Sequence, residues 1–162
     1  MSGLNIMVVT NSYRSQQSAL VGLVNHKVFV VSEYYEALNL LQEQGDKIDV
    51  VLCDFAIPSK EQIGKTVPNR GAAVMIAMRA ALCGVKSAIV LPRNWHSRDR
   101  ALYEADETVR ALCRGGMDAR LNVNGTELMV VQMNLDVDHY EAIDWNAALS
   151  RLMCEDSTVR VA

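Results

Sequence analysis

The sequence lacks the short motifs by which several classes of binding and catalytic sites are recognised. It has four cysteines among 162 residues but no C-x-x-C pair, so the cysteine spacing does not predict a zinc site. It has no G-x-G-x-x-G and no P-loop, which removes the usual signature of a dinucleotide or nucleoside triphosphate site. We therefore expect no cofactor and no metal, and we interpret the cysteines as buried free thiols of a reducing compartment: Cys53, Cys83, Cys113 and Cys154.

Strong charge and targeting segments are also missing. The net charge is only -3, whereas a general nucleic-acid binder is usually strongly basic, so a nucleic-acid partner is not expected. The first residues lack a basic segment followed by an apolar one, which predicts no signal peptide. The longest apolar run, residues 71–85, is interrupted by Arg79 and is shorter than the ~20 residues of a membrane helix. We expect a cytoplasmic protein without membrane association, with one domain over residues 1–154 and a flexible tail over 155–162.

What the sequence does contain is an alternation of apolar strand-length runs with helical patterns. The strand runs are apolar throughout, which is typical of parallel strands covered on both faces, and lie at residues 5–10, 27–31, 48–55 and 87–91. Helical spacing is found at residues 15–24, 33–45 after a Ser32 N-cap, 71–84, from 97 or 99 to 113, and 140–153. The connection 56–70 contains Pro58, Gly64 and Pro68 and is expected to have little regular structure.

Strands that alternate with helices predict an α/β fold with right-handed crossovers. Asn124-Gly125 lies between two extended runs, 120–123 and 126–133, and predicts a type I′ hairpin. We expect a flavodoxin-like three-layer sandwich with a central parallel sheet in the order 2-1-3-4-5. A sixth, antiparallel strand is expected at the edge that carries the hairpin.

The stretch from Asp49 to Pro58 is a buried strand that ends in Asp54 and is followed by a proline. Together with the preceding strand, helix and strand, it resembles the receiver domain of response regulators over residues 5–90. The resemblance implies that Asp54 occupies the place of the phospho-acceptor. The chain departs from the receiver pattern at the positions of the other conserved groups. Thr10 and Asn11 stand where a receiver has an acidic pair, Leu91-Pro92 replaces its threonine or serine, and no lysine follows residues 126–133.

Phosphoryl transfer to a carboxylate needs a hard cation to neutralise the converging oxygens, and neutral residues beside Asp54 would hold Mg²⁺ weakly. We therefore predict a degenerate, pseudo-receiver module that is not an enzyme and acts as a regulatory protein through protein contacts. In this interpretation Asp54 caps the turn around residues 55–56.

An alternative function starts from the basic loops that follow the predicted strands. In an open α/β sheet these loops meet at one edge, where helix N-termini and cations suit an anionic ligand. The alternative is a small enzyme or sensor for a phosphorylated or nucleotide ligand, bound by Asn11, Ser12, Asp54, Arg70, Arg93 and His96. A solvated basic rim, paired with nearby carboxylates, accounts for the same residues.

The helical segment 71–84 is apolar on nearly every side, with Arg79 as its sole charge. A helix that covers a sheet needs only one apolar stripe, so either the preceding connection or a partner covers its outer face. Its small residues permit close packing of two helices and predict a homodimer through Val74, Ala77, Met78 and Ala81.

Overall fold

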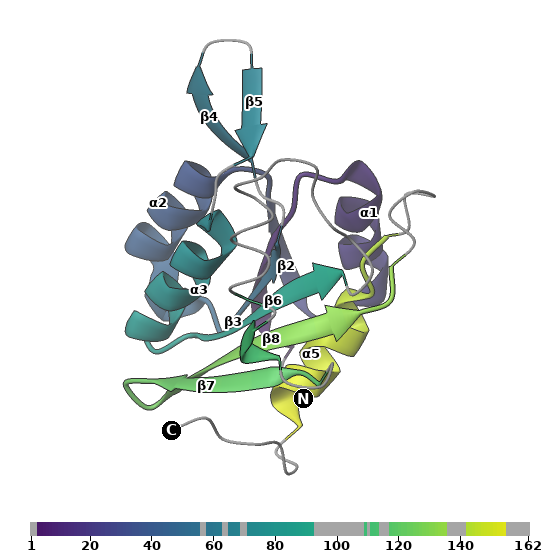
Figure 1. The fold of residues 1–162 in the computed structure, drawn as a ribbon, viewed down its shortest axis with the longest axis vertical. Coiled ribbons are helices and arrows are strands. Elements are labelled where there is room, and N and C mark those ends of the chain that lie inside the picture. Colours follow the sequence, from purple (N-terminus) through teal and green to yellow (C-terminus); the bar gives the residue numbers. More distant parts are fainter. Residues whose placement is uncertain are drawn as a thin grey trace.

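A computed structural model describes residues 3–55, 58–62, 65–68, 71–92, 109, 111–113, 117–135 and 142–154. Six strands form one sheet: β1 (Asn5–Val9), β2 (Lys27–Val31), β3 (Val50–Asp54), β6 (Lys86–Pro92), β7 (Ala119–Val123) and β8 (Thr126–Met133). Their order across the sheet is β2-β1-β3-β6-β8-β7, and every neighbouring pair is parallel except β7 with β8 (Figure 1).

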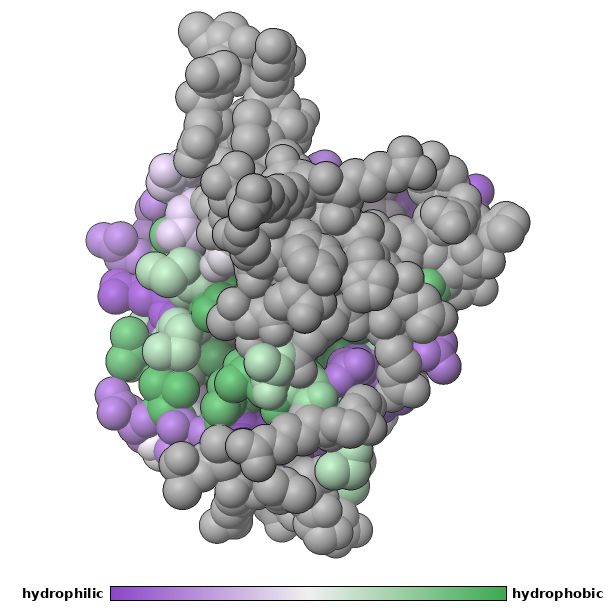
Figure 2. All heavy atoms as spheres, viewed as in Figure 1, coloured by the Kyte–Doolittle hydropathy of each residue, from purple (hydrophilic) through white to green (hydrophobic). Residues whose placement is uncertain are grey.

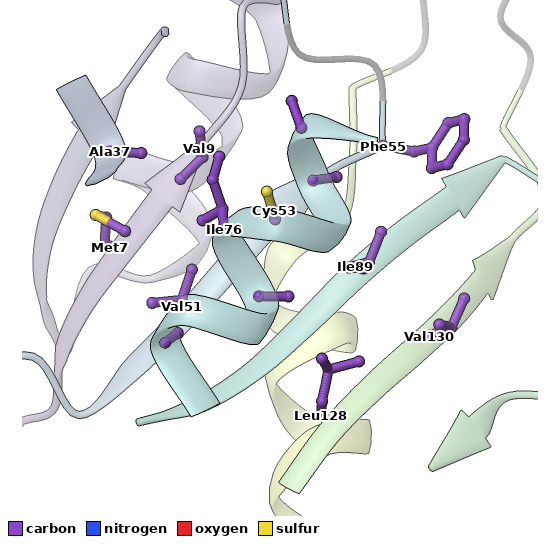
Figure 3. Close-up of a cluster of buried hydrophobic side chains, with 14 of the residues drawn as sticks. Met7, Val9, Ala37, Val51, Cys53, Phe55, Ile76, Ile89, Leu128 and Val130 are labelled. Carbon is purple, nitrogen blue, oxygen red and sulfur yellow. The ribbon is translucent and has the colours of Figure 1, made fainter. Parts of the chain in front are cut away.

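Helices cover both faces of this sheet. One face carries α1 (Tyr13–Gly22) and α5 (Trp145–Met153), and the other carries α2 (Tyr34–Gln44), followed by the short 3₁₀ helix η1 (Gly45–Lys47), and α3 (Ala72–Leu82). Alternate strand residues supply the two cores, because successive side chains of a strand point to opposite faces. In β1, Ile6 and Val8 pack on the α1/α5 side, whereas Met7 and Val9 pack on the α2/α3 side shown in Figure 3. This three-layer α/β arrangement is consistent with a flavodoxin-like fold, as the sequence predicted.

The strand order differs from the prediction at the hairpin. Numbered along the chain, the sheet reads 2-1-3-4-6-5, because the second hairpin strand, β8, pairs with β6 and the first, β7, lies at the edge. Residues 128–133 of β8 are all buried, whereas β7 carries Arg120 and the exposed Asn122. The apolar strand therefore takes the inner place and the more polar strand takes the edge. The type I′ turn is confirmed, since Asn124 and Gly125 have φ angles of 49° and 84°.

The connection between β3 and α3 was predicted wrongly. It contains β4 (Pro58–Gln62) and β5 (Lys65–Pro68), which pair antiparallel as a separate two-stranded sheet that projects from the body (Figure 1). Pro58 and Pro68 pair at its base, at the first position of one strand and the last of the other. At the ends of strands the missing proline N–H costs little, so prolines mark the limits of this hairpin and do not exclude it.

Capping explains where the helices begin. α1 begins at Tyr13, ahead of the predicted residue 15, because the Ser12 Oγ accepts a hydrogen bond from the Ser15 N–H at 3.3 Å. α5 begins at Trp145, well after the predicted residue 140, because the Asp144 carboxylate accepts from the Ala147 N–H at 2.9 Å.

Two further helix predictions have different outcomes. The N-cap of α2 is Glu33, so the prediction of Ser32 in this role is wrong. Most of the helix predicted from residue 97 or 99 to 113 lies outside the described residues, as does the tail 155–162. Two residues of that segment, Val109 and Cys113, are buried in the α2/α3-side core.

Buried and half-buried hydrogen bonds join α1 to the start of α5 and to Ile143, just before it. The Ser15 Oγ accepts from the Ile143 N–H at 3.2 Å, and the Ser15 carbonyl accepts from the indole N–H of Trp145 at 2.8 Å. The Ser18 hydroxyl donates to the Ile143 carbonyl at 2.8 Å. The Ser18 side of α1 therefore faces the segment that leads into α5, which fixes the rotation of α1 on the sheet.

Candidate functional site

The residues singled out by the sequence meet at the carboxyl ends of β1 and β3, which are neighbours in the sheet. Thr10, Asn11 and Ser12 follow β1 directly, and Asp54 is the last residue of β3. Because parallel neighbours end at the same edge, these four residues lie together. The sequence predicted this edge for Asn11, Ser12 and Asp54, but it did not include Thr10. Arg70, Arg93 and His96, the remaining residues of the predicted anion site, lie outside the described residues.

A hydrogen bond from a buried threonine holds the Asp54 carboxylate. The Thr10 hydroxyl donates to Oδ2 of Asp54 at 2.9 Å, and the Thr10 oxygen in turn accepts from the Ser12 N–H at 3.3 Å. Thr10 is fully buried, and its backbone is fixed on both sides: its N–H donates to the Val31 carbonyl and its carbonyl accepts from the Gln16 side chain. The Asp54 carboxylate is thus bound to a neutral donor whose position is fixed by backbone hydrogen bonds. Breaking the bond from Thr10 would therefore cost free energy.

The side chains next to Thr10 have other roles. Asn11 is exposed, and the Ser12 hydroxyl serves as the N-cap of α1. The Ser12 oxygen is therefore engaged in holding the first turn of α1. The described part of the chain contains no group of three or more His, Cys, Asp or Glu side chains that could hold a metal ion.

Cys53 lies next to Asp54, but its side chain points into the α2/α3-side core (Figure 3). Burial, and to a lesser degree the Asp54 charge, raise the pKa of the Cys53 thiol well above its usual value. A thiol that stays protonated is a poor nucleophile and a poor metal ligand, so Cys53 acts as a core residue. The prediction of buried free thiols holds for Cys53 and Cys113 and is wrong for Cys83 and Cys154, which are free but exposed.

The structure contradicts part of the predicted interface on α3. Ala77 and Ala81 are buried within the protein's own fold, because α3 packs closely on β3, β6 and α2 through its small residues. Neither alanine is accessible to a partner, so their assignment to an interface is wrong. Val74 and Met78 are half-buried against the same core. The side chains that α3 does expose are Met75, Arg79 and Leu82.

The sequence reasoning missed the part that Thr10 plays, because it treated this residue only as a missing acid. The signal that could have found it is positional. A hydroxyl residue directly after one buried strand lies opposite an aspartate that ends the neighbouring parallel strand. Such a pair is within reach of a hydrogen bond whenever the strands are in this register.

No model of a known protein family matches this chain, and no curated protein matches it. Among solved structures, it is similar to a candidate pilus assembly-related protein from Burkholderia pseudomallei, with a TM-score of 0.44 and 13% sequence identity over 93% of this chain and 90% of that one. Of the described helices, none is both long and apolar enough to cross a membrane. None of these comparisons assigns the chain to a family.

Proposed function

We propose that this protein is a receiver-like regulatory module that is not phosphorylated and works through protein–protein contacts. The observation that carries the proposal is the hydrogen bond from Thr10 to Asp54. In a receiver an acidic residue follows the first strand and helps to hold Mg²⁺ beside the acceptor aspartate. Here Thr10, a neutral hydroxyl residue, follows the first strand and donates directly to the carboxylate.

This difference changes the electrostatics of the edge. Phosphoryl transfer brings three charged oxygens toward the carboxylate, and a cation normally offsets their repulsion. A hydroxyl donor stabilises the Asp54 carboxylate but adds no positive charge and no metal ligand of high affinity. The module is therefore expected to keep the receiver's scaffold and to have lost its chemistry.

Intact-mass spectrometry after incubation with acetyl phosphate and Mg²⁺ tests the first half of the proposal. We expect no gain of a phosphoryl group, while an ordinary receiver domain treated in parallel is modified. A phosphoryl adduct on the wild type that is absent from Asp54→Asn would refute the loss of chemistry.

The contact face that we propose is the outer side of α3. Met75 and Leu82 are each 56% exposed, Met78 is half-buried between them, and Tyr35 of the adjacent α2 is also 56% exposed. Figure 2 shows hydrophobic side chains gathered where α3 lies in Figure 1. Exposed apolar side chains grouped on one face favour a protein partner with an apolar surface of its own.

A comparison of charged variants tests this face. Met75→Glu and Leu82→Glu should abolish capture of a partner that binds the wild type, because each places a charge in the buried contact. Met153→Glu is the matched control, since Met153 is an exposed methionine on α5, on the opposite face of the sheet. Capture that survives both α3 variants would exclude this face.

A further inference from the structure

The outermost strand β2 has a hydrogen-bonding edge that no described strand covers. Its only strand partner in the described residues is β1. The Lys27 N–H donates to the Leu4 carbonyl at 2.8 Å, and the Val31 carbonyl accepts from the Thr10 N–H at 2.9 Å. In a parallel pair alternate residues face the same neighbour, so the N–H and C=O groups of Val28 and Val30 point away from β1. Such an edge is a ready template for another strand.

An apolar stripe on α1 borders the same edge. The Ser18 side of α1 faces the segment leading into α5, and Leu20 lies about 200° further round a helix of 100° per residue. Tyr13 and Leu20 share that opposite flank of α1 and are 72% and 50% exposed, and Val24, two residues past the end of the helix, is 73% exposed. Because α1 contacts α5 on one side and β2 on the other, this stripe runs beside that edge of β2.

The sequence of this edge is complementary to itself. Residues 27–33 begin with Lys27 and end with Glu33, two residues past β2, where the backbone of Glu33 is itself extended, with φ -134° and ψ 151°. If two copies pair antiparallel about a two-fold axis at Val30, Lys27 of each copy lies opposite Glu33 of the other. Phe29 then lies opposite Val31, and both pairs are of kinds that stabilise antiparallel strands.

We propose that a second copy of the chain pairs with β2 in this register and forms a symmetric dimer with a continuous sheet. The outward groups of Val28 and Val30 gain partners, and the α1 stripes are brought to the border of the contact. Only an antiparallel copy matches the charges at both ends of the strand. This dimer surface is independent of the α3 face, and it replaces α3 as the site of self-association.

The charge pairs cannot form within one chain. Lys27 and Glu33 are separated by six residues of extended backbone, or about 20 Å at ~3.3 Å per residue. Within its own chain Lys27 Nζ lies over the ring of Phe29, 5.0 Å from its centroid. Any energetic coupling between Lys27 and Glu33 therefore has to arise between two copies.

Charge reversal and mixing test the proposal by sedimentation equilibrium on the full chain. Lys27→Glu and Glu33→Lys should each raise the dimer Kd roughly tenfold, because each creates two like-charge pairs per dimer. An equimolar mixture of the two variants should form a heterodimer with both pairs restored, and the double variant should regain the wild-type Kd. A wild type that stays monomeric at several hundred micromolar, or variants whose mixture associates no better than either alone, would overturn the proposal.

Hydrogen exchange supplies a second readout that does not depend on charge. The amides of Val28 and Val30 should exchange more slowly as protein concentration rises, whereas the amide of Phe29, bonded to β1, should not depend on concentration. Val30→Pro removes the outward N–H, and Val30→Ala is the control that loses the valine packing on the core but keeps that N–H; only the former should weaken the dimer while circular dichroism reports an intact fold. A dimer that Met75→Glu dissociates and Val30→Pro leaves intact would place self-association on α3 and overturn the assignment to β2.

Discussion

Thr10 is fully buried, yet it carries the polar contact that sets the character of the candidate site. That a carboxylate would end the third strand followed from the apolar run before Asp54. That Thr10 would bind it did not follow, because the contact depends on the register of β1 against β3, which local sequence does not encode. The same limit applies to exposure: Cys83 lies in an apolar segment but just beyond the end of α3, where the chain turns away from the core.

The bond from Thr10 to Asp54 should be measurable as stability. Thr10→Val keeps the volume but removes the donor, so we expect the free energy of unfolding to fall by about 1–3 kcal/mol in urea denaturation. Thr10→Ser retains the hydroxyl and should cost less. Equal losses for the two variants would mean that the side chain's packing, and not its hydrogen bond, supports the site.

Cysteine labelling separates the four thiols by environment. Burial and the Asp54 charge raise the pKa of Cys53, so at pH 8 it has less thiolate than an exposed cysteine, and its reaction with iodoacetamide should remain slow. Cys83 and Cys154 should react first in the native protein, as mass spectrometry of the digested product would report. Labelling of Cys53 at the rate of Cys83 would contradict the buried position of its side chain.

At the scale of elements, apolar periodicity predicted helices and strands well and their relative positions less well. The helix α3 was recognised from its composition, but composition alone could not tell the buried Ala77 from the exposed Met75, because both fit an apolar surface. The order of β7 and β8 was missed for a similar reason. The order depends on which hairpin strand offers the more continuous apolar surface to β6. Packing against the rest of the fold decides this, and local sequence does not.

Arg120 on β7 ties the hairpin to the end of α5. Its guanidinium donates to the Arg151 and Cys154 carbonyls at the helix C-terminus and pairs with Glu127. Arg120→Lys keeps the charge but cannot supply all these bonds, so we expect a loss of about 1–3 kcal/mol in the free energy of unfolding.

Lys86 provides the control for that variant. It pairs with the same Glu127, but at 3.9 Å and with a side chain that is 43% exposed. Lys86→Ala should therefore change the free energy of unfolding by no more than about 0.5 kcal/mol. If chemical denaturation gave equal losses in the free energy of unfolding for the two variants, the hydrogen bonds from Arg120 to the end of α5 would contribute no more to stability than the exposed Lys86 pair.

At the scale of the whole molecule, the three-layer α/β architecture was predicted from sequence because it follows from two periodicities and the handedness of crossovers. Function was harder to predict, since receiver chemistry depends on a few residues at one edge and most of these differ here. Those differences, from Thr10 to the neutral Asn11, are the reason that we propose a binding role and not turnover.

The two edges of the sheet are chemically unlike. The β2 edge carries the half-buried Val28, Phe29 and Val30, whereas the β7 edge, of the same length, carries Arg120 and the exposed Asn122. A sheet whose two edges can both pair with other copies can add them without limit and grow into a fibre. If only one edge can pair, a single isologous contact buries that edge in both copies, so assembly ends at the dimer. Light scattering at increasing concentration should accordingly level off at the mass of a dimer.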